Sequence, residues 1–434
     1  MTALGNSPKV NGWTLAPVVT GLDFPTSLVF APDGRCFVAE SGLPFAEAKP
    51  GGRVWQVSAN GERRLVADGF PPPLNGLSWH DGGLIVASLG QLDRLDPDST
   101  RTLILDGLPT GGNYHTNMAV AGSDGWLYFG QGAITNTGVV GLDAIELAWQ
   151  RRITPAYDIP GYAVTLTGVE AETPNPLSDD KQARARTGAF VAFGAPGRAG
   201  LRISAGLPCT AAVMRVRPDG TGLELVAWGL RNAFGVGFLP DGRLLAVDQG
   251  ADDRGSRPLG NVPDLLFSVT PGAWYGWPDF IGGDPVTDPR YLPERGPRPA
   301  FVLANHAALP LPQKPLYRFR SHVAATKFAV LPQAAKSGQT RIAIALFGDE
   351  KPMTAPAGPP IGRSVAILSL DRGPLEVLPV DGLVRPIDVA FHPEDGSLHI
   401  LDFGHFEMLA GGGLAATAGS GTLWRAVPRQ EDSP

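Results

Sequence analysis

Three short loops of this sequence place ionisable or amide side chains directly before an apolar segment. His115 stands in the loop 113–117, Arg231 and Asn232 stand together in a second loop, and Arg385 stands in a third. A neutral imidazole accepts a hydroxyl proton near neutral pH, and a guanidinium binds a carboxylate through paired hydrogen bonds. These residue types predict a site that deprotonates a hydroxyl group beside a bound carboxylate. The simpler alternative is that Asn and Arg only satisfy backbone groups at the loop entries.

An oxygen-rich run follows the second of these loops. Residues 248–253 read Asp-Gln-Gly-Ala-Asp-Asp. Carboxylates and backbone carbonyls are the hard oxygen ligands that Ca²⁺ prefers. The run is therefore a candidate cation site, although acidic residues at a strand end also serve as solvated caps.

Each of these loops is followed by a segment that recurs along the chain. An apolar run, an Asp-Gly turn and a second apolar run appear five times, with the turns at Asp33, Asp81, Asp124, Asp241 and Asp395, and a degenerate sixth copy spans 324–349. Gly after Asp tolerates the positive φ that tight hairpins require. Six repeated hairpins predict a β-propeller. Aligning the copies on their turns gives His115, Asn232 and Arg385 one equivalent position around the central axis.

A second, more polar hairpin follows the first in several repeats. Segments 52–66, 212–226 and 363–378 alternate apolar with polar residues, as an outer strand pair does. We therefore predict an all-β fold, a single six-bladed β-propeller over residues 14–428 with four-stranded antiparallel blades.

Two long insertions interrupt the repeats, at about residues 133–210 and 270–313. The first contains one helix-like stretch, 142–152, and we expect it to lie over one face of the propeller. The second opens with the aromatic cluster 274–280, whose rings either pack in the interior or stack on a ligand. We expect the glycine-rich tail from residue 411 to be flexible until a closing strand at 422–427.

The composition limits the possible partners. The chain has 434 residues with 56 Gly and 42 Pro, which suits many short strands and turns. Its net charge of -6 and its lack of a basic block argue against nucleic acid. No apolar run approaches the roughly 20 residues that cross a membrane, and no secretory signal is visible. We expect Cys36 and Cys209 to be free, buried thiols rather than a disulfide.

At the segments 112–132, 227–250 and 272–279, the chain resembles the glucose/sorbosone dehydrogenase family of soluble quinoprotein sugar dehydrogenases. The resemblance covers about residues 22–406. It implies a six-bladed propeller that binds pyrroloquinoline quinone and Ca²⁺ and oxidises an aldose-type sugar at C1. It also implies an external electron acceptor, such as a cytochrome, a quinone or a dye, and a periplasmic or secreted location.

The resemblance implies a role for each matching residue. His115 would be the general base for the sugar C1 hydroxyl, from which hydride would pass to the quinone. The cofactor would be held by Arg231, Asn232, Gln249 and Arg385. Carbonyls of Gly250 and Ala251 would bind Ca²⁺, which polarises the quinone as a Lewis acid.

The sequence departs from the family pattern in its cationic residues. The second Arg of the Arg-x-Arg-Asp stretch is Ile387 here, although Asp388 is kept. The family's Lys is absent at the aligned place, where Gly362 and Arg363 stand, and Arg363 is the candidate that compensates for it. The acidic run after Gly250 is not intact, so the resemblance does not extend to a second, structural Ca²⁺.

Two other functions fit a six-bladed propeller. One is a Ca²⁺-dependent lactonase, for which Asn117, Asn232 and Asp248 are the available ligands, although no Glu stands at the first inner-loop entry. The other is a non-catalytic, ligand-binding propeller, which the missing cationic residues favour.

Overall fold

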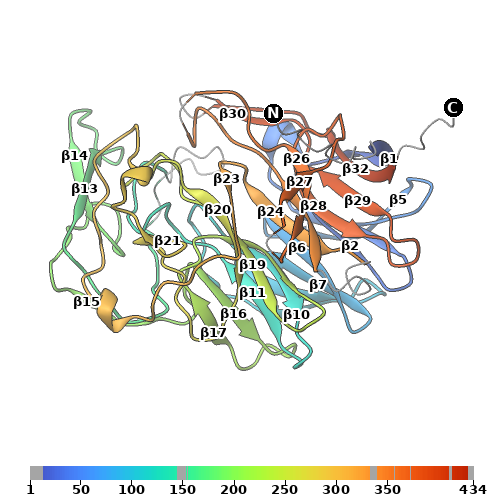
Figure 1. Ribbon diagram of the computed structural model, residues 1–434, viewed down its shortest axis with the longest axis horizontal. Helices are drawn as coiled ribbons and strands as arrows, with labels where there is room; N and C mark the ends of the chain where they lie inside the picture. Colours follow the sequence, from blue (N-terminus) through green and yellow to red (C-terminus); the bar gives the residue numbers. More distant parts are fainter. Residues whose placement is uncertain are drawn as a thin grey trace, which may run out of the picture.

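The computed structural model describes residues 13–143, 153, 155–332, 340–355, 357–371, 373–409 and 413–428. Almost all regular structure in these residues is β-strand, and it includes six four-stranded antiparallel sheets (Figure 1). Each innermost strand contacts the innermost strand of the next sheet, and the last contacts the first, so the six sheets form a closed ring. The predicted six-bladed β-propeller is confirmed.

The first three blades follow in chain order. Blade one consists of β2 (Pro25–Phe30), β3 (Cys36–Glu40), β4 (Gly52–Val57) and β5 (Arg63–Phe70). Blade two consists of β6 (Leu74–His80), β7 (Gly83–Ser88), β8 (Gln91–Leu95) and β9 (Arg101–Leu105). Blade three consists of β10 (Thr116–Ala121), β11 (Leu127–Gln131), β16 (Ala212–Val216) and β17 (Glu224–Trp228).

Blades four and five also follow in chain order, and blade six joins the two ends of the chain. Blade four consists of β18 (Ala233–Phe238), β19 (Leu244–Asp248), β20 (Pro263–Ser268) and β23 (Tyr317–Ser321). Blade five consists of β24 (Ala325–Val330), β25 (Arg341–Leu346), β26 (Ser364–Ser369) and β27 (Leu375–Val377). Blade six consists of β28 (Pro386–Phe391), β29 (Leu398–Asp402), β32 (Gly421–Pro428) and β1 (Trp13–Leu22). Strand β1 pairs antiparallel with β32 and forms the outer edge of this blade.

The Asp-Gly turns join the two innermost strands of five blades. Their glycines have φ between +67° and +87°, a conformation that other residues adopt only at a cost: Gly34, Gly82, Gly125, Gly242 and Gly396. These turns fix the pairing of each inner hairpin, and hence which residue enters each strand at the axis.

The two insertions contact each other beside the propeller. The first, between β11 and β16, contains two small sheets, β12 (Val164–Thr165) with β15 (Arg202–Ile203) and β13 (Glu170–Pro174) with β14 (Arg184–Gly188). The second, between β20 and β23, contains β21 (Phe280–Ile281) with β22 (Asp284–Pro285), and the 3-10 helices η2 (Pro289–Tyr291) and η3 (His306–Ala308). A β-bridge joins Leu166 to Leu303, and both insertions gather at one end of the molecule (Figure 1). Most of the helix-like stretch 142–152 lies outside the described residues.

The expectation of a flexible tail is wrong for the part that the structure describes. Strands β30 (Phe406–Leu409) and β31 (Gly413–Ala416) form a hairpin between β29 and β32. Phe406 and Met408 are both 4% exposed, so this hairpin is held by apolar burial at alternate positions. The predicted closing strand corresponds to β32.

The interior accounts for two features of the sequence. Trp274 and Tyr275 are 0% and 2% exposed, and Trp274 stacks on Trp228 with ring centroids 6.2 Å apart, so the aromatic cluster packs in the core. Cys36 and Cys209 are free and buried, as predicted, and burial raises the pKa of each thiol to about 12. Among the described helices, none is long and apolar enough to span a membrane.

Candidate functional site

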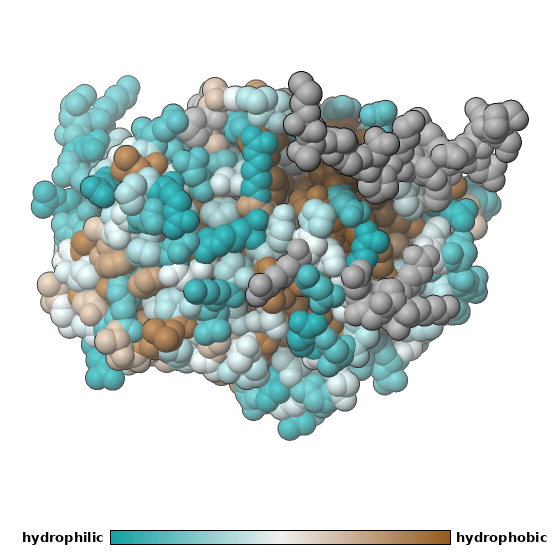
Figure 2. Space-filling model, in the orientation of Figure 1, coloured by the Kyte–Doolittle hydropathy of each residue, from teal (hydrophilic) through white to brown (hydrophobic). Residues whose placement is uncertain are grey.

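One cavity lies where the six innermost strands begin. The second residue of each of these strands lines it, and we call these six the ring residues: Thr26, Asn75, Asn117, Phe234, Thr326 and Ile387. The cavity has a volume of about 240 Å³, room for a small molecule. Figure 2 shows hydrophobic side chains gathered in a hollow over the region where Figure 1 labels β24 and β28.

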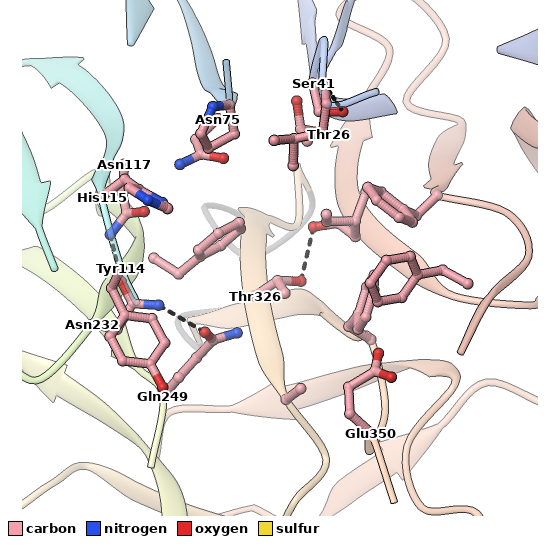
Figure 3. Close-up of a pocket in the computed structure, with 18 of the residues that line it drawn as sticks. Thr26, Ser41, Asn75, Tyr114, His115, Asn117, Asn232, Gln249, Thr326 and Glu350 are labelled. Atoms are coloured by element: carbon pink, nitrogen blue, oxygen red, sulfur yellow. Dashed lines mark hydrogen bonds between the residues drawn. The ribbon is translucent and has the colours of Figure 1, made fainter. Parts of the chain in front are cut away.

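The four polar ring residues each donate a hydrogen bond to the backbone of the next blade. The bonds run from Thr26 Oγ1 to Leu74 O (2.5 Å), Asn75 Nδ2 to Thr116 O (3.0 Å), Asn117 Nδ2 to Ala233 O (3.2 Å) and Thr326 Oγ1 to Ile387 O (2.8 Å). These bonds hold the side chains in fixed orientations around the axis, as Figure 3 shows for Thr326.

A buried ammonium group lies across the axis next to the ring residues. Lys327, 1% exposed, comes from blade five and donates to the carbonyl oxygens of Thr26 and Asn75 at 2.7 and 2.6 Å. Its Nζ lies 3.6 Å from Asp388 Oδ2 of blade six. Because its acceptors belong to blades one and two, Lys327 ties four blades together and is committed to that role.

His115 lines the axial cavity. It directly precedes β10, in the same register as Asn232 before β18 and Arg385 before β28. Burial lowers the pKa of His115 to about 4, against the opposing effect of a hydrogen bond with the Gly112 backbone. The imidazole is therefore neutral at neutral pH and able to accept a proton.

Asn232 and Gln249 belong to a chain of side-chain amides along the same wall. Asn117 Nδ2 donates to Asn232 Oδ1 at 2.8 Å, and Asn232 Nδ2 donates to Gln249 Oε1 at 2.8 Å (Figure 3). Gln249 Nε2 donates onward to the Ala325 carbonyl at 3.3 Å. The structure thus brings three sequence-predicted residues, His115, Asn232 and Gln249, to one cavity.

Arg385 does not line this cavity, contrary to expectation. Its side chain is 0% exposed; Nε donates to the Phe406 carbonyl at 2.6 Å, and Nη1 donates to the Asp349 carbonyl at 3.1 Å. Nη2 donates to Glu407 Oε2 at 2.7 Å, and Nη1 lies 3.1 Å from Glu350 Oε1. The equivalent register is right, but this guanidinium satisfies neighbouring backbone and carboxyl groups instead of facing the axis.

Arg231 is likewise engaged, beside the residues expected to bind Ca²⁺. Its Nη1 donates to the carbonyls of Gln249 at 3.1 Å and Gly250 at 2.5 Å, and its Nη2 to Asp252 Oδ2 at 3.1 Å. Burial lowers the pKa of Arg231 to about 10, so it stays charged at neutral pH. The positively charged group that binds the Gly250 carbonyl is therefore the Arg231 guanidinium. Ala251 lines a small separate cavity of about 30 Å³ with Gly250.

Arg363 is also absent from the cavity lining. It makes a two-pronged ion pair with Glu407, with both nitrogen–oxygen distances 2.8 Å. Because Glu407 also binds Arg385, the two arginines share one carboxylate and leave Glu350 as the second acid of the cluster.

Glu350 is the cavity residue that the repeat pattern does not reveal. It follows β25, in a loop without a turn signature, and lies across the cavity from His115 in Figure 3. Burial raises its pKa to about 8, the nearby Glu407 adds to this, and Arg385 and the Met408 amide oppose it. At neutral pH Glu350 is therefore mostly a protonated carboxylic acid that can donate a hydrogen bond.

The apolar wall was also missed from the sequence. It consists largely of rings from blades five and six and from the loop before β4: Phe45, Phe347, Phe403 and Phe406, with Met408 beside them. The alternation of Phe406 and Met408 within β30 is the one local signal that could have found this wall.

The three candidate lactonase ligands do not converge on the axial cavity. Asp248 Oδ1 accepts the backbone N–H of Asn232 at 2.7 Å, and Asp248 does not line the axial cavity with Asn117 and Asn232. Within the described part of the chain, no group of three or more His, Cys, Asp or Glu residues is placed to hold a metal ion.

Comparison with known proteins places the fold. No protein-family model matches the sequence, and no curated protein matches it. An oxidoreductase (glucose dehydrogenase) of Thermus thermophilus has a similar structure, with TM-score 0.55 and 19% identity over 96% of this chain and 100% of that one. The holo form of the PQQ domain of a Coprinopsis cinerea pyranose dehydrogenase is also similar, with TM-score 0.58 and 14% identity over 96% of each chain.

A third similar structure is the soluble aldose sugar dehydrogenase of Escherichia coli, with TM-score 0.50 and 15% identity over 96% of this chain and 99% of that one. At these identities the likeness establishes the shared propeller fold. It supports, at the level of fold, the resemblance to the sugar dehydrogenases.

Proposed function

We propose that this protein is an oxidoreductase that oxidises an aldose-type sugar at C1 in the axial cavity. The observation that carries the proposal is a neutral imidazole, His115, at a cavity lined by amide and hydroxyl side chains and by aromatic rings. The fold shared with sugar dehydrogenases supports the same reaction class.

The chain's own residues supply binding and proton transfer. Asn75, Asn117 and Gln249 have amide groups that orient sugar hydroxyls, while the phenylalanine rings cover the apolar faces of a pyranose. His115 accepts the C1 hydroxyl proton while hydride passes from C1 to a two-electron acceptor of the quinone or dye class. The electrons leave through an external acceptor such as a cytochrome, a quinone or a dye, and the resemblance favours a periplasmic or secreted location.

The cofactor that the resemblance implies does not fit these residues well. Pyrroloquinoline quinone carries three carboxylates, and carboxylates are held by cationic donors. Among the described residues that line the axial cavity there is no Lys or Arg, and Glu350 adds an acidic group. The Gly250 carbonyl, expected to bind Ca²⁺, accepts a hydrogen bond from Arg231. We therefore assign no step of the reaction to this quinone or to Ca²⁺.

The first test substitutes the base. We expect His115→Gln to lower aldose-dependent dye reduction by about 10²–10⁴-fold, the usual contribution of a general base. Because the pKa of His115 is about 4, wild-type turnover should persist well below pH 6.5 and fall only as the imidazole protonates near pH 4. The assay is run with and without added pyrroloquinoline quinone and Ca²⁺, over pH 4–8, after circular dichroism shows that the variant is folded.

Two results would redirect the proposal. Full turnover in His115→Gln would remove His115 from the mechanism. No aldose oxidation in wild type under any of these conditions would contradict the oxidoreductase and leave a ligand-binding propeller or a hydrolase.

Hydrolysis of a sugar lactone is the second candidate. It is favoured by two un-ionised groups on opposite sides of the cavity: the His115 imidazole, which can accept a proton, and the Glu350 carboxylic acid, which can donate one. Hydrolysis by such an acid and base needs no redox partner. Proton release from D-glucono-1,5-lactone, followed in a pH-stat, distinguishes it from aldose oxidation.

A further inference from the structure

The ionisable lining of the axial cavity is sparse. Of the described residues that line it, only Tyr114, His115 and Glu350 titrate. Arg231, which lines the adjoining side pocket, and Arg385 have side chains that are 4% and 0% exposed, and both guanidinium groups are bound by carbonyl and carboxyl oxygens. A ligand carboxylate would therefore enter the cavity without a cationic partner and would lose its hydration, which is costly.

Glu350 occupies the wall where a cation would be needed. Its side chain is 12% exposed; Oε2 accepts the Met408 amide at 3.1 Å, and Oε1 lies 3.1 Å from Arg385 Nη1 but makes no hydrogen bond. Arg385 is already neutralised by Glu407 at 2.7 Å. The carboxyl of Glu350 therefore retains hydrogen-bonding capacity that a hydroxyl-bearing ligand in the cavity can use.

We propose that the axial cavity selects an uncharged, hydroxyl-bearing ligand, to which the Glu350 carboxyl donates a hydrogen bond, and that it rejects polycarboxylates. This inference rests on the proposed function only in taking the axial cavity as the binding site. It names the ligand class that this chain accepts and separates it from the tricarboxylate quinone that its sequence resemblance implies.

Above pH 7, the loss of the Glu350 proton is the main change of charge among the groups around this side chain. The groups that face it are Arg385, Arg363 and Glu407, and a side pocket of about 90 Å³ adds Tyr114, Arg231, Asp252, Asp264, His322 and Asp349. Arg231, whose pKa is about 10, keeps its charge over this pH range. Burial lowers the pKa of His322, so it is neutral above pH 7, and the pKa of Asp264, about 6, makes it an anion there. Raising the pH from 7 to 9 ionises Glu350, whose pKa is about 8, and should strengthen the rejection of anions.

The test measures binding rather than turnover. Wild-type protein is mixed with pyrroloquinoline quinone, with and without Ca²⁺, and the retained quinone is measured by absorbance after ultrafiltration at pH 7 and pH 9. We expect no stoichiometric retention at micromolar quinone. Ile387→Arg, which adds a cation at a ring residue, should bind the quinone at least about tenfold more tightly than wild type, whereas the neutral control Ile387→Met should not.

Glu350→Gln provides a second variant that keeps the shape of the side chain. It should retain more quinone than wild type, and the difference should grow by about tenfold per pH unit above pH 8, since only the wild type gains a negative charge there. Glu407→Gln removes a carboxylate outside the cavity lining that raises the pKa of Glu350, so it should move the onset of the pH-dependent rejection to lower pH.

One outcome overturns the inference directly. Stoichiometric retention of pyrroloquinoline quinone by the wild type at micromolar concentration would show that the cavity accepts a tricarboxylate. That result would leave the proposed sugar oxidation standing, whereas loss of the proposed function would appear in the His115→Gln and aldose assays and not in this binding measurement.

Discussion

At the residue scale, the same side chain can bind a ligand or hold the protein together. Arg385 and Arg231 stand at the loop entries where the repeats converge, yet their donors are taken by carbonyls and carboxyls of their own chain. A buried guanidinium needs partners for its N–H groups, and the nearest oxygens here belong to the loops after β19 and β25 and to β30. Their loss should therefore affect stability before it affects a ligand.

Arg385→Met tests this assignment. Glu407 would keep Arg363, but the buried carbonyls of Phe406 and Asp349 would lose their donor, and leaving such acceptors unsatisfied costs at least about 1–3 kcal/mol. The free energy of unfolding, measured with urea, should fall by that amount. Arg363→Met removes a partly exposed ion pair with Glu407 and should lower the free energy of unfolding by no more than about 1 kcal/mol. Equal stability of Arg385→Met and wild type would contradict the assignment.

The sequence located those site residues whose position depends on strand register. His115, Asn232 and Gln249 sit at or beside the ends of inner strands, so the Asp-Gly turns were enough to bring them to one cavity. Glu350 could not be found this way, because it lies in a loop whose path depends on its contacts with Arg385 and Met408. The partners of the arginines were hidden for the same reason, since they are carbonyl and carboxyl oxygens of loops and of β30.

At the scale of elements, the inner strands explain why the axial cavity keeps its shape. The second residue of each inner strand faces the axis, and in four blades its side chain binds the backbone of the next blade. The inner and outer hairpins were predictable because two-residue periodicity and turn residues are local signals. The β30–β31 hairpin was not, since its second strand consists mostly of Gly and Ala, which have little intrinsic preference for a strand, and is held by tertiary packing.

Thr26→Val tests the contribution of one such link. Valine keeps the branched shape of Thr26 but leaves the buried Leu74 carbonyl without its hydrogen bond, which should cost about 1–3 kcal/mol. The exposed Thr102→Val on outer strand β9 is the matched control and should change stability by no more than about 0.5 kcal/mol. Urea unfolding of both variants gives the comparison; a Thr26→Val curve that overlays the control would show that the link contributes nothing.

At the scale of the whole molecule, ring closure and the site share one hydrophobic cluster. Strand β1 completes blade six by pairing with β32 along its whole length. Its buried Val19 and Leu22 belong to the same core cluster as Phe403, Phe406 and Met408, which line the axial cavity. The N-terminal strand therefore shares one packed core with the aromatic wall of the cavity, although it contains no site residue.

Removal of residues 1–22 should consequently weaken both the ring and the site. The backbone edge of β32 would lose its partner, and the lost burial of Val19 and Leu22 would cost about 1.5–3 kcal/mol each. We expect a lower thermal midpoint, a broader transition and weaker ligand binding at the axial cavity. Removal of residues 1–12 alone keeps β1 and is the reference with which the longer truncation is compared. If the shorter truncation and the longer one unfold at the same temperature with equal cooperativity, then blade six is stable without its outer strand, and the aromatic wall does not depend on β1.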